Sequence, residues 1–255
     1  MAFLAQDTSG DKVITKTTPR SASMDFRYGL RKGIPIALGY VPVAFTFGLL
    51  AASGGISPWM ATVISLTNLT SAGQFAGTNL IIAGAPLLEI AVTTFVINIR
   101  YLLMSLSLSQ KLTSGTSLIK RAIMAFGITD ETFAVASLEQ GDISFSYMLG
   151  LVSSPYWGWA AGTFVGALIC SVLPPAVQSS MGIALYAMFI ALIVPSAKRS
   201  KPVLATTVIA VVVSCLFTWA PHLRDISAGW GITIAAITAS AVGALVFPRE
   251  EVQDE

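Results

Sequence analysis

Apolar runs long enough to cross a membrane recur along most of the chain, separated by short polar or proline-containing segments. A membrane-spanning helix needs about 20 mainly apolar residues. Eight stretches approach this pattern, at residues 33–53, 59–83, 86–110, 122–138, 147–173, 182–194, 203–220 and 226–247. The pattern therefore predicts an all-α polytopic membrane protein with about seven or eight membrane segments.

Polar residues interrupt the second run at the depth of the membrane centre. The middle of residues 59–83 contains Asn68, Ser71, Gly73 and Gln74. One interpretation is a continuous helix whose polar face packs against other helices. The other is a helix broken near residues 71–73, whose free amides and half-helix N-terminus face an anionic group. The residues alone leave both open.

A cation lies near the middle of the third run. Arg100 is flanked there by Asn98 and Tyr101. A guanidinium at the centre of a membrane helix costs roughly 2.5–3.5 kcal/mol on insertion scales. We therefore expect Arg100 to face a substrate, a water-filled cavity or a partner group. A purely structural ion pair with an acid on a neighbouring helix is the alternative.

Two adjacent carboxylates interrupt the fourth run. Asp130 and Glu131 lie within residues 122–138 and are natural counter-charges for Arg100, or a proton-carrying site. The alternative is an interfacial or re-entrant segment whose acids meet water.

The distribution of basic residues gives the expected topology. Arg27, Arg31 and Lys32 precede the first run and predict a cytoplasmic N-terminus. If every run crosses the membrane, the cations of the loop at 111–121 lie on the side opposite the cytoplasm, against the positive-inside rule. Either they break the rule, or one of the runs 59–83 and 122–138 is re-entrant, so we expect at least one broken or re-entrant segment.

Composition limits the remaining possibilities. Of 255 residues, 54% are apolar and 11% charged, less than half the charge usual in soluble domains. We expect one transmembrane transporter domain at 25–248, a disordered cytoplasmic tail at 1–24 and a short acidic tail at 249–255.

Residues 33–83 and 147–195 resemble each other weakly, which suggests an internal repeat. The net charge of +2 does not indicate a nucleic-acid surface.

Motifs of enzymes and cofactor-binding proteins are absent from the sequence. There is no GK[ST] phosphate loop, and one histidine, His222, cannot build a histidine metal site. We therefore expect no enzyme, metal or cofactor. Secondary transport remains, with a non-transporting scaffold subunit as the competing class.

Several stretches occur together in a characteristic order: GISPW, SAGQFAGTNLIIAGAPLLEI, VINIRYLLMSLSLS, ITDETFA and YAMFIALIVP. Over about residues 27–247 the chain resembles the AzlC family, the large subunit of two-component branched-chain amino-acid exporters. The matching residues are Gln74, Phe75, Asn98, Arg100, Thr129, Asp130, Glu131, Met188, Phe189 and Pro195. Family members often have Ser where this chain has Gly73, and His where it has Tyr101.

The resemblance implies export of valine, leucine, isoleucine or methionine across a bacterial inner membrane, together with a small AzlD-type membrane subunit. It also allows a higher hetero-oligomer. A zwitterionic amino acid needs a cation for its carboxylate and an acceptor for its ammonium group. The expected substrate-binding residues are Arg100, Asn98, Gln74, Gly73, Ser71, Asn68 and Tyr101, with Asp130 and Glu131 for proton coupling or counter-charge.

Overall fold

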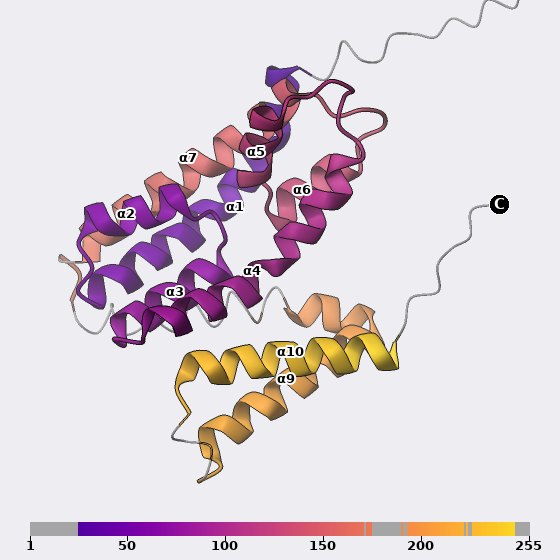
Figure 1. The fold of residues 1–255 in the computed structure, drawn as a ribbon. Helices are drawn as coiled ribbons and strands as arrows, with labels where there is room; N and C mark the ends of the chain where they lie inside the picture. The colour runs from indigo at the N-terminus through magenta and orange to yellow at the C-terminus, as the bar shows by residue number, and fades with distance from the viewer. Residues whose placement is uncertain are drawn as a thin grey trace, which may run out of the picture.

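The computed structural model describes residues 25–170, 172–174, 190, 193–221, 223 and 226–247. Over these residues it is built of helices (Figure 1): α1 (Phe26–Ser53), α2 (Pro58–Thr67), α3 (Ala72–Ile82), α4 (Leu87–Ser109), α5 (Leu118–Phe126), α6 (Asp130–Ser137), α7 (Phe145–Cys170), α9 (Lys201–Trp219) and α10 (Ala228–Val246). The predicted all-α class is confirmed for the described chain.

Four of the described helices, α1, α4, α9 and α10, are long and apolar enough to span a membrane. The predicted count of seven or eight segments is therefore not confirmed. The tails at 1–24 and 249–255, His222, Met188, Phe189 and most of residues 182–194 lie outside the described residues. The expected internal repeat, in which residues 147–195 resemble residues 33–83, includes some of these undescribed residues and stays a prediction.

Helices α1 and α7 lie side by side and form the centre of the N-terminal part of the fold (Figure 1). Glycines bring their backbones together, because a Cβ on Gly29 would lie 2.1 Å from the carbonyl oxygen of Tyr147. A Cβ on Gly48 would lie equally close to that of Thr163. The contacts advance in the same direction along both helices, so α1 and α7 run parallel. Small residues allow such close approach in membranes.

Helices α2 and α3 form a hairpin that returns to the end of the molecule where it began. Helix α2 starts just after α1 ends, and the chain breaks at residues 68–71. In α3 the ring of Phe75 then packs against that of Phe47 in α1, with 5.2 Å between centroids. At its end, Ile82 contacts Gly54, the residue that follows α1. The alternative of a broken helix in residues 59–83 is therefore confirmed.

Helices α5 and α6 form a second hairpin, which enters from the opposite end (Figure 1). At the start of α5 the Lys120 ammonium lies 5.6 Å from the ring centroid of Phe145, the first residue of α7. The chain breaks at 127–129. After α6, the carboxylate of Glu139 accepts a hydrogen bond from the Tyr28 hydroxyl near the start of α1.

The two hairpins explain how the cations that precede α1 and those of the loop at 111–121 lie at the same end of the molecule. Helix α4 runs back between them, and after its end the Lys111 ammonium donates to the carbonyl of Ser137 at 2.6 Å. The Lys32 ammonium lies 3.5 Å from the Glu139 carboxylate at the same end. Both ambiguous segments double back, whereas the sequence left open either one re-entrant segment or a break of the positive-inside rule. The cations of the 111–121 loop consequently lie with those that precede α1; we call this the basic end and the opposite one the far end.

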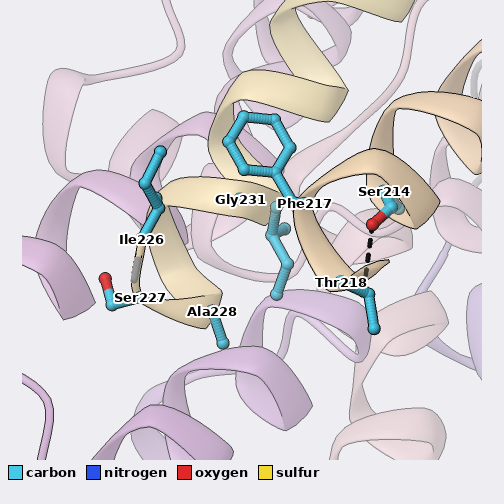
Figure 2. Close-up of a pocket in the computed structure, with 8 residues that line it drawn as sticks. Ser214, Phe217, Thr218, Ile226, Ser227, Ala228 and Gly231 are labelled. Carbon is cyan, nitrogen blue, oxygen red and sulfur yellow. Dashed lines mark hydrogen bonds between the residues drawn. The ribbon is translucent and has the colours of Figure 1, made fainter. Parts of the chain in front are cut away.

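Helices α9 and α10 form an antiparallel pair beside α3 and α4 (Figure 1). A Cβ on Gly243 would meet the Thr206 hydroxyl at 2.6 Å, and one on Gly231 would meet Phe217 at 3.5 Å. Between the end of α9 and the start of α10 lies a cavity of about 490 Å³, whose lining includes Ser214, Thr218, Ser227 and Ala228 (Figure 2).

The glycine contacts predict a sharp contrast between two substitutions in α1. Gly48→Ala should destabilise the protein, because overpacking against a backbone atom costs about 1–3 kcal/mol or more. Gly39→Ala is the matched control, since a Cβ there meets nothing within 4 Å. Thermal unfolding in detergent checks this. Equal unfolding temperatures would contradict the parallel packing of α1 and α7.

The hairpins predict which cysteines label together. In a chain lacking Cys170 and Cys215, Ser53→Cys and Ala83→Cys should react with an impermeant thiol reagent from one side of the membrane. Arg27→Cys and Ser114→Cys should react from the other side. A continuous crossing between α1 and α4 would instead place Ser53 and Ala83 on opposite sides.

Candidate functional site

The tips of the two hairpins meet beside the middle of α1, α4 and α7. The first tip is residues 68–71, between α2 and α3, and the second is residues 127–129, between α5 and α6. Each tip is followed by the N-terminal turn of a short helix, which carries partial positive charge and unpaired amide groups. The site is assembled around these two turns.

The first tip adopts an unusual backbone conformation. Ser71 has φ 47°, and its side chain does not cap α3. Few residues other than glycine adopt this left-handed region. The Thr70 hydroxyl donates to Asn68 Oδ1 at 2.6 Å, and the Thr70 carbonyl accepts from the Tyr101 hydroxyl of α4 at 3.1 Å. The first tip, which includes Asn68 and Ser71, is therefore bonded to Tyr101 of α4.

Gly73 brings the first turn of α3 against the side chain of Asn98. A Cβ on Gly73 would lie 2.2 Å from Asn98 Oδ1. That oxygen is buried and has no hydrogen-bond partner in the described chain. Gly77 lies one turn later in α3 and Thr94 one turn earlier in α4, and a Cβ on Gly77 would lie 3.2 Å from the Thr94 hydroxyl. The glycine at position 73 is thus what lets an amide side chain approach this turn.

Gln74 lies inside the protein and connects the first hairpin to α7. Its side-chain amide is 1% exposed and is bonded at both ends. Oε1 accepts from the indole of Trp159 at 2.9 Å, and Nε2 donates to the Ser65 hydroxyl at 2.6 Å. Ser65 in turn lies 2.7 Å from the Thr163 hydroxyl. This series of hydrogen bonds fixes the angle between α2, α3 and α7.

The second tip is capped by its own side chains. The Thr129 hydroxyl accepts from the amide of Thr132, and the Thr132 hydroxyl accepts from the amide of Thr129. The Tyr40 hydroxyl lies 2.7 Å from that of Thr129 and donates to the carboxylate of Glu131. Glu131 is therefore held by α1.

Asp130 and Arg100 join the two tips. Asp130 Oδ2 lies 3.0 Å from Arg100 Nη1, so the two charges form an ion pair. Arg100 Nη2 donates to the Tyr101 hydroxyl at 3.2 Å, which in turn bonds the first tip. The side chains of Arg100 and Asp130 are 43% and 47% exposed. Arg100 Nε is buried and lacks a hydrogen-bond partner in the described chain.

The nine residues predicted for the site lie at the first tip (Asn68 and Ser71), in the first turns of α3 (Gly73 and Gln74) and α6 (Asp130 and Glu131), and in α4 (Asn98, Arg100 and Tyr101). Sequence reasoning missed the aromatic residues Tyr40 and Trp159, whose rings pack at 5.3 Å. Their polar atoms were the available signal, because a buried Tyr hydroxyl or Trp N–H needs a partner. Among the described residues no group of three His, Cys, Asp or Glu side chains could hold a metal ion.

Comparisons with known proteins agree on one family. A family model described as AzlC protein matches residues 35–173, more than half of the chain. The inner membrane protein YgaZ of Escherichia coli is 33% identical over 195 residues, which cover 74% of this chain and 80% of YgaZ. The chain belongs to the AzlC family.

Other relatives are named as membrane proteins or as a transporter. An uncharacterized membrane protein of Archaeoglobus fulgidus is 37% identical over 180 residues, covering 70% of this chain and 78% of that protein. The branched-chain amino acid transport protein AzlC of Bacillus subtilis is 24% identical over 153 residues, covering 57% and 58%. No solved structure shows a significant match. The AzlC match includes both hairpins and α4, and therefore the whole candidate site.

The contact between Gly73 and Asn98 predicts a graded effect of added methyl groups. Gly73→Ala should displace the Asn98 amide and lower the unfolding temperature, because its Cβ would overlap that side chain. Gly77→Ala should have the smaller effect, since its nearest neighbour is 3.2 Å away. Asn98→Ala should restore stability to Gly73→Ala, as measured by thermal unfolding. An unchanged defect in the double variant would contradict the contact.

Proposed function

We propose that this protein is a secondary transporter that exports branched-chain amino acids, namely valine, leucine, isoleucine and also methionine. It would act as the large subunit of a two-component exporter in a bacterial inner membrane, with its N-terminus in the cytoplasm. Family membership and the name of the Bacillus subtilis relative, a branched-chain amino acid transport protein, support this class of function. The basic end carries the excess of Lys and Arg that favours a cytoplasmic position.

The observation that carries the proposal is the half-exposed ion pair of Arg100 and Asp130 where the two tips meet. Charged groups at membrane depth that remain accessible mark substrate or ion pathways. Secondary transporters also bind substrates where discontinuous helices present their N-terminal ends. Here α3 and α6 both begin at this point.

A zwitterionic amino acid matches the charges of this site. Its carboxylate would be received by Arg100 or by the amides of the first turn of α3, near Ser71 and Gly73. Its ammonium group would be received by Asp130 or Glu131. Substrate binding would thus replace the direct ion pair with two new ones, so that neither charge is left unpaired at membrane depth.

Other residues would hold this geometry. Tyr101 orients the guanidinium and ties it to Thr70. Asn98 and Asn68 would offer polar contacts beside the first tip. For Gln74 we propose a positioning role, because both ends of its amide are already bonded inside the protein.

A small AzlD-type membrane subunit is the expected partner, within a hetero-oligomer. Helix α9 offers a surface on which such a subunit would pack, since none of the residues of α9 is buried within this protein. The energy source would be an ion gradient, with Asp130 or Glu131 as counter-charge or proton carrier.

One observation favours a second candidate function. Arg100 and Asp130 pair with each other, as the charges of a non-transporting scaffold subunit would. In that case the pair would serve stability alone, and no amino acid would stabilise the protein against heating.

Export of labelled valine, leucine and methionine from cells that express the chain, alone and with an AzlD-type subunit, tests the proposal. Arg100→Ala should reduce export to the level of cells without the protein, because the carboxylate loses its cation. Arg121→Ala is the matched control, since its guanidinium is exposed at the base of the second hairpin. Normal export by a correctly inserted Arg100→Ala variant would exclude this site.

A further inference from the structure

A buried carboxylate outside the site lies between α4 and α10. Glu89 is 3% exposed, and its Oε1 accepts a hydrogen bond from the backbone amide of Gly229 at 2.9 Å. A Cβ on Gly229 would lie 2.5 Å from that oxygen, so glycine is what permits the approach. One turn further along both helices, the hydroxyls of Thr93 and Thr233 lie 3.2 Å apart. The two helices thus meet through polar groups at the first turns of α10.

No described cation balances this carboxylate. The ion pairs of the described residues join Lys32 with Glu139 and Arg100 with Asp130. Helices α3 and α10 contain no ionisable residue, and α9 contains only Lys201 and Cys215.

Within α4 the other ionisable residues are Arg100 and Tyr101. Arg100 is eleven residues beyond Glu89, about 16 Å along the helix axis. The short segment ahead of α10 carries His222, Arg224 and Asp225, which lie outside the described residues. In the described chain, the positive end of α10 is what stabilises the ionised form of Glu89.

Two opposing physical effects act on the carboxyl group of Glu89. The ionised form gains the Gly229 amide and the partial charge of the α10 N-terminus, while the neutral form avoids the cost of a buried charge. The same turn borders a cavity, because Ser227 and Ala228 line the space between α9 and α10 (Figure 2). Buried carboxylates within membrane spans often carry protons, and Glu89 lies in the candidate span α4 with no cationic partner among the described residues.

We propose that Glu89 binds and releases a proton when transport is coupled to a pH gradient, a role separate from that of Asp130 and Glu131 in the site; this inference rests on the transport function proposed above. The proton would bind a carboxylate oxygen of Glu89 from one side of the membrane and leave to the other. Protonation removes the negative charge from the group that accepts from the Gly229 amide, so it weakens this hydrogen bond between α4 and α10 without abolishing it. Helix α4 also carries Arg100 and Asn98, so this contact is linked to the site through one rigid element.

The competing explanation is that Glu89 only caps α10. Glu89→Gln separates the two, because the glutamine oxygen still accepts from Gly229 but cannot change its charge. Glu89→Asp keeps a titratable carboxyl group, and Thr93→Val alters the same contact without touching that group.

The experiment uses membrane vesicles from the cells of the export assay and labelled valine as the probe. Two rates are measured for each variant: valine exchange without a gradient, and net valine movement driven by an imposed pH gradient. Glu89→Gln should retain exchange and lose the response to the gradient. Glu89→Asp and Thr93→Val should retain both.

Three results would overturn the proposal. The first is gradient-driven valine movement at the normal rate in Glu89→Gln. The second is loss of gradient-driven movement in a folded Glu89→Asp variant. The third is net valine movement by the wild-type protein that does not change with the pH gradient. If Glu89→Gln does not fold, the result for Glu89→Asp decides. Absence of any valine transport by the wild-type protein would instead refute the proposed function, and the inference falls with it.

Discussion

Two helices stop halfway through this molecule, and their free backbone groups must find partners inside the protein. At membrane depth an unsatisfied backbone group costs several kcal/mol, so a broken helix is tolerated only where protein or a cavity satisfies it. Tyrosine hydroxyls meet this demand at the first break, where Tyr156 donates to the carbonyl of Leu66 and Tyr101 to that of Thr70. Tyr101 also accepts from Arg100, so the same hydroxyl holds the guanidinium beside the first break.

Local properties of the sequence indicated the helical class and one of the two breaks. Its apolar runs indicated a helical membrane protein, and the cluster around Gly73 suggested a break where α3 begins. Charge alone linked Arg100 to an acid in the segment that contains Asp130, since an arginine at membrane depth needs a counter-charge. These inferences depend on composition and depth, which are local properties of the chain.

The path of the chain could not be predicted in the same way. Residues 59–83 are long enough to cross, and only packing reveals that Ile82 returns to Gly54. The basic loop at 111–121 indicated one re-entrant segment, but charge counting could not show that both segments double back. The role of Gln74 was hidden for a similar reason, because its partners Trp159 and Ser65 are distant in sequence.

Helix α4 is the element on which the separate parts of the structure converge. One of its faces places Thr94 and Asn98 against the glycines of α3, and another places Glu89 and Thr93 against α10. Residues 89, 93 and 100 share a face, since eleven residues are close to three full turns. The guanidinium at the hairpin tips therefore cannot shift along the helix axis without altering the α10 contact. Because the contact with α3 lies opposite, any rotation of α4 changes both interfaces at once.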